Sequence, residues 1–190
     1  MVRLILGITG ASGAIFGVRT LEALRALDIE THLVLSRWAR VTIASETNYS
    51  VEQLERLSSA AYHHDNQAAP VSSGSFRTDG MIVAPCSMKT LAAIRSGFGE
   101  TLICRAADVV LKERRKLVLL ARESPVSEIH LENMLALARM GVTIFPPVPA
   151  FYNRPQTICD LVDHIVGRVL DQFGLDMPGL TRWTGFNAGS

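Results

Sequence analysis

Glycine and serine follow the first apolar run of the chain, in the stretch LILGITGASGAIFG at residues 4–17. A strand that passes through such a loop into a helix leaves free backbone N–H groups at the helix N-terminus, where an anion is stabilised. The glycines do not match G-x-G-x-x-G, and no Gly-Lys-Ser/Thr follows, so neither a dinucleotide fingerprint nor a P-loop is indicated. The loop is either an anion site around Ser12 or a tight turn that needs glycine, and the residues alone leave both open.

A second helix start of this kind lies in APCSMKTLAAI, at residues 84–94. Ser87, Lys89 and Thr90 would place hydroxyl and ammonium donors at the N-terminus of the helix, which again favours an anion. Ser87 is equally explained as a plain N-cap, a role that is compatible with ligand binding. Cys86 has no histidine nearby in the sequence, and we interpret it as a small buried hydrophobe rather than a nucleophile.

Charged residues gather on the helix predicted around CRAADVVLKERR and after the strand that follows it. Arg105, Asp108 and Lys112 are spaced i, i+3 and i+7, which is also typical of a solvated helix face with one ion pair. Arg122 and Glu123 come at the carboxyl end of the next strand. A phosphate needs several cations, and a leaving phosphate also needs a proton donor. A carboxylate flanked by arginines at a strand end is therefore a candidate site.

Three further residues are candidates only in combination with these. Glu46, in ASETN, ends the helix after the second strand and is either an acid–base group or an ordinary surface glutamate. Tyr152 lies in a proline-rich segment, and Arg168 lies at the border of the apolar stripe on the last helix. Neither is distinctive alone.

The sequence predicts no metal site. His63, His64 and Asp65 are adjacent, but we interpret them as solvated side chains of a polar loop. HLENM is not H-E-x-x-H, and no aspartate-rich magnesium motif is present. Chemistry on a phosphate would then depend on arginine and lysine.

Short apolar runs and helical stripes alternate along the chain and must position these residues. The runs at 3–8, 31–35, 80–84, 116–121 and 142–145 are apolar on both faces, as in strands covered on two sides. Helical stripes follow, at Leu131, Met134, Leu135 and Ala138 and along residues 158–173. This alternation predicts an α/β fold with a parallel, doubly wound sheet in a single domain over residues 1–190. Ligands bind beyond the carboxyl ends of the strands in such sheets.

The remaining segments are predicted to lack regular structure. Residues 58–75 are polar and rich in small side chains, and residues 146–155 hold four prolines in PPVPAFYNRP. The tail from about residue 178 is loop-like. Its aromatic residues Trp183 and Phe186 suggest that it folds back onto the domain.

Composition narrows the class of protein. Hydrophobic residues make up 48% of the 190 residues, charged residues 19%, and the net charge is +1, with a mean hydropathy of +0.22. These values point away from nucleic-acid or membrane-surface binding and favour a chain that hides apolar surface in a homo-oligomer. The N-terminal apolar run is too short for a signal peptide or a spanning helix. Three cysteines without metal-type spacing are typical of the cytoplasm.

Taken together, TGASGA, ETN, SSGSF, APCSMKTLA, RAADVVLKERRKLVLLARESP, HLENM and PPVPAFYNRPQ resemble the flavin prenyltransferases of the UbiX/Pad family. The resemblance runs in order from about residue 3 to Trp183. It implies a Rossmann-like fold, assembled as a dodecamer with FMN at the subunit interface. It also implies an enzyme that joins the dimethylallyl group of dimethylallyl phosphate to reduced FMN, at N5 and then at C6, without a metal. The product, prenylated FMN, would serve UbiD-type decarboxylases.

The resemblance also implies roles for individual residues. The positions that match flavin-binding loops are Gly10, Ala11, Ser12, Ser36, Ser87, Met88, Lys89, Thr90 and Arg122. The positions that match the substrate-phosphate pocket are Tyr152 and Arg168, joined by Arg105, Lys112 and Glu123. Trp183 resembles an aromatic residue that closes over the site.

On this resemblance we assign catalytic roles to three residues. Ser12 and Glu123 would relay a proton to the departing phosphate, and Glu46 would accept the C6 proton or stabilise the nearby cation. A non-catalytic carrier that delivers FMN to a decarboxylase is the alternative function, although it would not need Glu46, Lys112 and Glu123 together. A flavin-dependent cysteine decarboxylase is less consistent with the sequence, because residues 13–28 contain no histidine.

Overall fold

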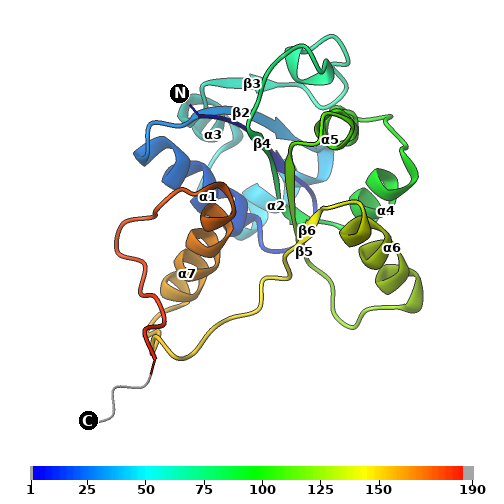
Figure 1. Ribbon diagram of the computed structural model, residues 1–190. Coiled ribbons are helices and arrows are strands. Elements are labelled where there is room, and N and C mark those ends of the chain that lie inside the picture. Colours follow the sequence, from blue (N-terminus) through cyan, green and yellow to red (C-terminus); the bar gives the residue numbers. More distant parts are fainter. Residues whose placement is uncertain (1, 186–190) are drawn as a thin grey trace.

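A computed structural model describes residues 2–185 of the chain. Its strands and helices alternate along the chain (Figure 1). In order they are β1 (Arg3–Ile8), α1 (Ala14–Ala26), β2 (Glu30–Leu35), α2 (Arg37–Glu46), α3 (Val51–Leu57), β3 (Ala60–Tyr62), η1 (Pro70–Ser72), β4 (Gly80–Cys86), α4 (Met88–Ser96), α5 (Leu102–Lys112), β5 (Lys116–Ala121), α6 (Glu128–Arg139), β6 (Thr143–Ile144), α7 (Ile158–Leu170) and η2 (Asp171–Phe173).

The strands form one six-stranded parallel sheet in the order β3-β2-β1-β4-β5-β6. This order confirms the predicted Rossmann-like, doubly wound fold, and every predicted strand is present. The prediction of an irregular segment over residues 58–75 is wrong at β3. This edge strand is three residues long and begins with two alanines, so it carries almost no β signal of its own.

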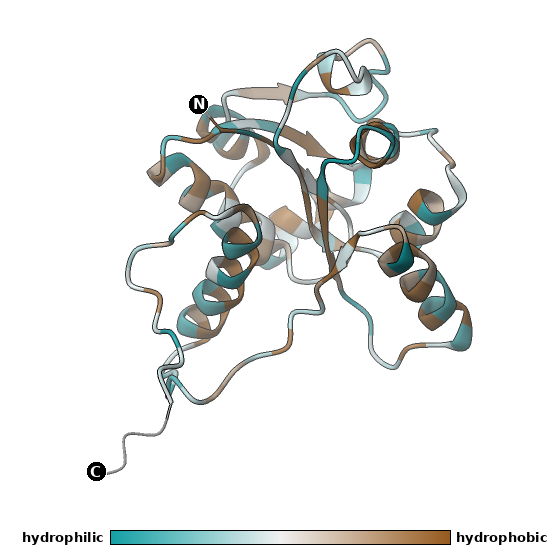
Figure 2. Cartoon of the chain, in the orientation of Figure 1, coloured by the Kyte–Doolittle hydropathy of each residue, from teal (hydrophilic) through white to brown (hydrophobic). Residues whose placement is uncertain are grey.

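Two helical layers cover the sheet. Alternation along β1 shows how, because Leu4, Leu6 and Ile8 pack with α1 and α7, whereas Ile5 packs with α4 and α5 on the other face. Figure 1 shows α1 and α7 on one side of the sheet and α4, α5 and α6 on the other, and Figure 2 shows apolar residues concentrated in the strands between them. Buried aliphatic side chains fill the space between the sheet and each of the two helical layers.

Most helices begin at a side-chain cap that the sequence supplies locally. Ser36, Ser87 and Thr101 cap α2, α4 and α5, and Thr157 forms a capping box with Asp160 at the start of α7. Helix α1 differs, because its N-cap is Gly13, with φ 98° and no side chain to cap the helix. Its free N–H groups therefore depend on a residue from elsewhere in the chain.

The apolar stripe on α6 does not face the core as its periodicity suggests. Leu131 and Leu135 are exposed, and the buried residue of this helix is Leu137. Periodicity shows that a helix has an apolar face but not what covers it, and within one chain this face is uncovered. On α7, by contrast, the predicted stripe is buried from Val162 to Leu170, although Ile158 is exposed.

The irregular C-terminal segments lie where the sequence suggests. The proline-rich segment at 146–155 is neither helix nor strand, as predicted, and the tail from residue 178 to 185 is a loop. Phe186 lies outside the described residues. No helix within residues 2–185 combines the length and the apolarity needed to cross a bilayer.

Candidate functional site

The centre of the sheet, where β1 and β4 lie side by side, is the point at which the strand order reverses. A buried hydroxyl joins the two loops that leave this point. Thr9 Oγ1 donates to the carbonyl oxygen of Pro85 at 2.8 Å and accepts from the N–H of Ser87 at 2.8 Å. The loop after β1 and the start of α4 are thereby held as one unit.

A cavity of about 550 Å³ opens beside this unit, and we call it the switch-point cavity. Ser36 and Ser87 line it, and each hydroxyl caps its own helix by accepting from the N–H of Ala39 (3.1 Å) and of Thr90 (3.3 Å). Two helix N-termini thus meet at one cavity, which suits an anionic group. The remaining lining residues relevant to binding are Thr9, Gly10, Arg37, Trp38, His64, Lys89, Thr90 and Cys104.

Gly10 is required by close packing at the rim of this cavity. A Cβ atom on Gly10 would lie 2.2 Å from Cβ of Trp38, so any larger residue would push α2 away from the loop. The structure therefore brings together five residues predicted to bind the cofactor: Gly10, Ser36, Ser87, Lys89 and Thr90. Met88 is different, because its side chain packs in the core against the α4–α5–α6 layer. Ala11 and Ser12 lie further along the same loop, before α1.

Glu46 provides the cap that α1 lacks. Its Oε2 accepts from the N–H groups of Gly13 (2.7 Å) and Ala14 (3.0 Å), and Ser12 donates to the same carboxylate. Burial acts to raise the pKa of Glu46, but these hydrogen bonds and the charge of Arg122 prevail and hold it below its usual value. Glu46 is therefore an ionised carboxylate at neutral pH, and it contacts Ser12, the residue that was predicted to relay a proton together with Glu123.

Arg122 and Glu123 follow β5 at the same edge of the sheet. The N–H of Arg122 donates to the carbonyl oxygen of Cys86 at 3.1 Å, which ties this loop to the end of β4. Both side chains are exposed, and Glu123 Oε1 accepts from the N–H of Ser124 at 3.1 Å. Arg122 thus lies close enough to Glu46 to affect its pKa, and Glu123 lies beside Arg122 in the chain.

A second cavity, also of about 550 Å³, lies between the proline-rich segment, α7 and the tail, and we call it the C-terminal cavity. Tyr152 and Arg168 both line it, as the predicted phosphate pair would require. The Tyr152 hydroxyl lies 2.9 Å from Nε2 of His164, and its ring packs edge-on against Trp183 with centroids 5.5 Å apart. Apolar walls complete the cavity at Phe145, Pro146, Val148, Ala150 and Ile165.

Asp171 fixes the two guanidinium groups of this cavity. It accepts from Arg168 Nη1 at 2.6 Å and, through both oxygens, from Arg182 at 2.7 and 2.8 Å. The hydrogen bonds from Arg182 are the main reason that the pKa of Asp171 is lowered. Arg182 also donates to Asp176 at 2.7 Å, so the cluster holds two guanidinium groups and two carboxylates beside apolar walls. That combination fits an anion attached to a small hydrocarbon group.

Arg105 and Lys112 do not join this pair within one chain. Both lie on α5, whereas Arg168 lies on α7, in the layer across the sheet. Arg105 donates to Asp108 at 2.8 Å, and Lys112 donates to Glu113 at 2.5 Å. A single phosphate pocket that contains Arg105 and Lys112 as well as Tyr152 and Arg168 therefore requires more than one copy of the chain.

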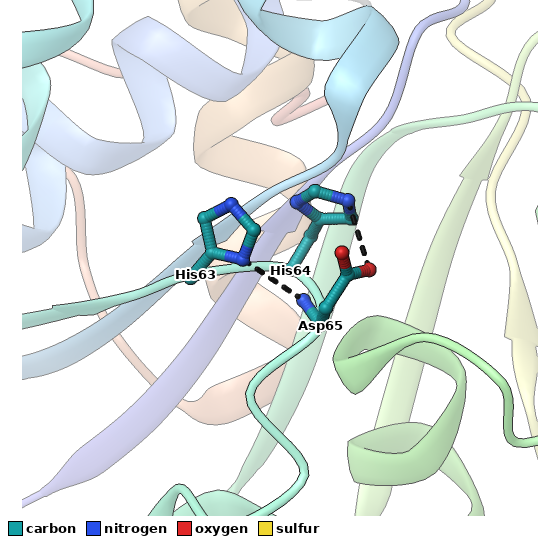
Figure 3. Close-up of side chains that lie close together, drawn as sticks. All are labelled: His63, His64 and Asp65. Carbon is teal, nitrogen blue, oxygen red and sulfur yellow. Dashed lines mark hydrogen bonds and ion pairs between the residues drawn. The ribbon is translucent and has the colours of Figure 1, made fainter.

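His63, His64 and Asp65 lie with one possible ligand atom of each residue within 4.8 Å of the others (Figure 3). The interpretation of all three as solvated is wrong for His64, which is 7% exposed. Arg37 occupies the cluster: its Nε lies 2.6 Å from Nε2 of His64, and its Nη2 lies 3.0 Å from Oδ2 of Asp65. The positive charge of the Arg37 guanidinium, which contacts both groups, opposes the binding of a second cation.

Cys86 is buried, as predicted for a small hydrophobe, and Cys159 is exposed. Cys86 and Cys104 are buried, and burial raises the pKa of both thiols. Neither thiol is therefore activated as a nucleophile at neutral pH.

Sequence reasoning missed three residues that line the two cavities: Arg37, His164 and Arg182. Two of them left a usable signal. His164 is a polar residue inside the apolar stripe of α7, four residues before Arg168 and so on the same face. Arg182 precedes the tail aromatic Trp183. Arg37 follows the N-cap Ser36, where nothing distinguishes it from a surface arginine.

The chain is similar to proteins of known family. A family model described as Flavoprotein matches residues 1–170. A probable UbiX-like flavin prenyltransferase from Streptomyces sp. (strain D7) is 63% identical over 188 residues, which cover 98% of this chain and 94% of that protein.

Two crystal structures match almost the whole chain. AnUbiX (PadA1), in complex with FMN and dimethylallyl pyrophosphate, is 57% identical with a TM-score of 0.96, and the match covers 98% of this chain and 99% of that one. A dodecameric FMN-dependent Ubix-like decarboxylase from Escherichia coli O157:H7 is 61% identical with a TM-score of 0.95, covering 96% and 100%.

Proposed function

The chain belongs to the flavoprotein family and, within it, to the UbiX-like flavin prenyltransferases, and we propose that it joins the dimethylallyl group of dimethylallyl phosphate to reduced FMN. The new bonds would form at N5 and then at C6, and prenylated FMN would leave to serve a UbiD-type decarboxylase. The observation that carries the proposal is the C-terminal cavity. Its apolar walls, Tyr152 and arginine pair suit an allylic phosphate.

The switch-point cavity fits FMN. The hydroxyls of Ser36, Ser87 and Thr90 and the charge of Lys89 would hold its ribityl phosphate at two helix N-termini, with Gly10 allowing close approach of the backbone. When bound in its reduced form, FMN supplies a nucleophilic nitrogen. Arg122, at the same edge of the sheet, would contact the flavin.

Tyr152 and Arg168 would bind the substrate phosphate and stabilise the charge that grows on it as the carbon–oxygen bond breaks. Ser12 and Glu123 would pass a proton to that phosphate, since a protonated phosphate is the better leaving group. Glu46, ionised and fixed at the start of α1, is suited either to accept the C6 proton or to stabilise a cation beside it.

We infer that the enzyme acts as a homo-oligomer, with a dodecamer as the expected form. The E. coli relative is dodecameric, and the exposed Leu131 and Leu135 of α6 offer apolar surface for such contacts. An oligomer would also let Arg105 and Lys112 of one subunit meet the C-terminal cavity of another. A cytoplasmic location is supported by the three cysteines, all of which are free.

The test is anaerobic. The protein is mixed with reduced FMN and dimethylallyl phosphate in the presence of a chelator, and the released flavin is analysed by mass spectrometry. A flavin heavier by one dimethylallyl unit is the expected result. Unmodified FMN, tightly bound with the donor present, would instead favour the FMN carrier. A parallel reaction with dimethylallyl pyrophosphate identifies the preferred donor, and unaltered turnover in Glu123→Gln across the pH range would contradict the proton relay.

A further inference from the structure

His164 interrupts the apolar face of α7. It is 7% exposed, and the buried side chains on either side of it in the helix are aliphatic. Burying an imidazole costs free energy unless it is hydrogen-bonded. Its hydrogen-bond partner is the hydroxyl of Tyr152, 2.9 Å from Nε2, with the two rings edge-to-face at 82°. This contact, rather than packing, explains a histidine at this position.

The surroundings of His164 keep it neutral. Burial lowers its pKa, the positive charge of Arg168 one helical turn away lowers it further, and Asp171 acts in the opposite direction. Arg182, from the tail, lines the same cavity and is paired with Asp171 and Asp176. A neutral imidazole carries one N–H, and that proton can reside on Nε2.

Counting protons then decides the direction of the hydrogen bond when a phosphate is bound. A phosphate dianion has no O–H to donate, so it needs the hydroxyl hydrogen of Tyr152. The phenol oxygen can donate that hydrogen and at the same time accept from Nε2–H of His164. If Tyr152 instead donated to His164, the phosphate would lose this donor.

We propose that His164 is a positioning residue for the substrate phosphate: its Nε2–H holds the phenol oxygen of Tyr152, so that the hydroxyl hydrogen points at the phosphate beside Arg168. The inference rests on the proposed function, in which Tyr152 and Arg168 bind that phosphate. Charge on the phosphate increases as the carbon–oxygen bond breaks, so a fixed donor favours the transition state over the bound substrate. A phenol that accepts a hydrogen bond is also a stronger donor.

The test is a double-mutant cycle between His164→Met and Tyr152→Phe. Methionine fills a similar volume without a hydrogen-bonding nitrogen. Steady-state rates are measured anaerobically with reduced FMN and varied dimethylallyl phosphate. We expect His164→Met to lower kcat/KM about five- to tenfold, with more of the change in kcat than in KM. In the Tyr152→Phe background the same change should have less than about a twofold effect.

Two further variants separate positioning from structure. His164→Gln keeps an N–H donor near the place of Nε2 and should restore most of the activity. Val166→Ala removes methyl groups from the buried face of the same helix, away from the cavity, and should lower the Tm without changing kcat or KM. If His164→Met does not fold, His164→Leu takes its place in the cycle.

A binding measurement gives a readout that does not depend on turnover. Calorimetric titration of dimethylallyl phosphate into protein that carries oxidised FMN, which cannot be alkylated in this way, should show weaker binding for His164→Met than for Val166→Ala.

The outcomes separate the two proposals. Wild-type protein that makes no prenylated FMN would overturn the proposed function. Active wild-type protein whose His164→Met variant matches Val166→Ala, or loses equal activity with and without Tyr152, would overturn the role of His164 alone.

Discussion

The two cavities of this chain hold their polar groups in different ways. In the switch-point cavity, Ser36 and Ser87 are fixed by the N-termini of the helices that they cap, directly after the strands. In the C-terminal cavity, Tyr152, Arg168 and Arg182 come from a proline-rich segment, a helix and the tail. The first cavity follows from the topology of the sheet. In the second, the positions of Arg168 and Arg182 depend on Asp171, which is 14% exposed and pairs with both.

This difference indicates which residues should affect the binding of a ligand and which should affect the chemical step. Groups built into helix N-termini suit a ligand that is held in one place, such as the phosphate of FMN. Donors that the tertiary structure fixes around a reacting group can stabilise the charge that grows on it during the reaction. Substitutions in the two cavities should therefore affect different steps.

The largest effect is expected from Arg168→Gln. Loss of a guanidinium from the phosphate site should lower kcat/KM for dimethylallyl phosphate about 10²-fold, as for other donors to a developing oxyanion. FMN binding, followed by flavin fluorescence, should be unchanged, because Arg168 does not line the switch-point cavity. Arg56→Gln, at an exposed position on α3, is the matched control. Equal losses of FMN affinity and of turnover would remove the distinction between the cavities.

Glu46→Gln should reduce turnover by about 10- to 100-fold, because the amide keeps an acceptor for the N–H groups of Gly13 and Ala14 but cannot take up a proton.

The same variant tests how the stability of the fold depends on pH. The pKa of Glu46 is lowered in the folded protein, so its ionised form stabilises the fold above the ordinary pKa of 4.5 and this stabilisation is lost as the pH falls through the folded value. Urea unfolding of Glu46→Gln between pH 3 and pH 6 should accordingly show a weaker loss of stability than wild type. If the variant loses as much stability as wild type between pH 3 and pH 6, the ionisation of Glu46 is not the source of that loss.

Ser87→Ala should act mainly on the first cavity. Removing the cap of α4 should cost about 1 kcal/mol of the free energy of unfolding and weaken FMN binding by about fivefold. The KM for dimethylallyl phosphate, measured at saturating FMN, should stay within a factor of about two. Ser127→Ala, which removes the cap of α6 away from both cavities, should cost similar stability without affecting FMN.

The smallest expected effect concerns His164 and the stability of the fold. Its pKa is lowered in the folded state, so the unfolded chain binds a proton first as the pH falls below the ordinary value of 6.5, and stability declines from that point. His64, whose pKa burial also lowers, contributes in the same direction. His164→Met should therefore remove part of the decline in Tm between pH 6.5 and pH 5. A decline equal to that of wild type would show that His164 titrates normally.

Much of the fold could be predicted because its signals are local. The five predicted strands are apolar on both faces, and the caps Ser36 and Ser87 come directly after two of them. Edge strand β3 could not be predicted, since Ala60–Tyr62 gains its strand conformation from pairing with β2. Periodicity predicted that α6 has an apolar face. It could not predict whether that face points to the core or to solvent, because periodicity does not specify a partner.

By itself, the sequence determined five of the six strands, the hydroxyls at two helix starts and the family to which the chain belongs. Only the tertiary structure decided that Glu46 caps α1 from 33 residues away, that Asp171 joins Arg168 to Arg182, and that His164 supports Tyr152. The physical reason is the range of the interactions. Caps and periodicity act over a few residues, whereas a buried polar group is satisfied by whichever segment the fold brings within about 3 Å.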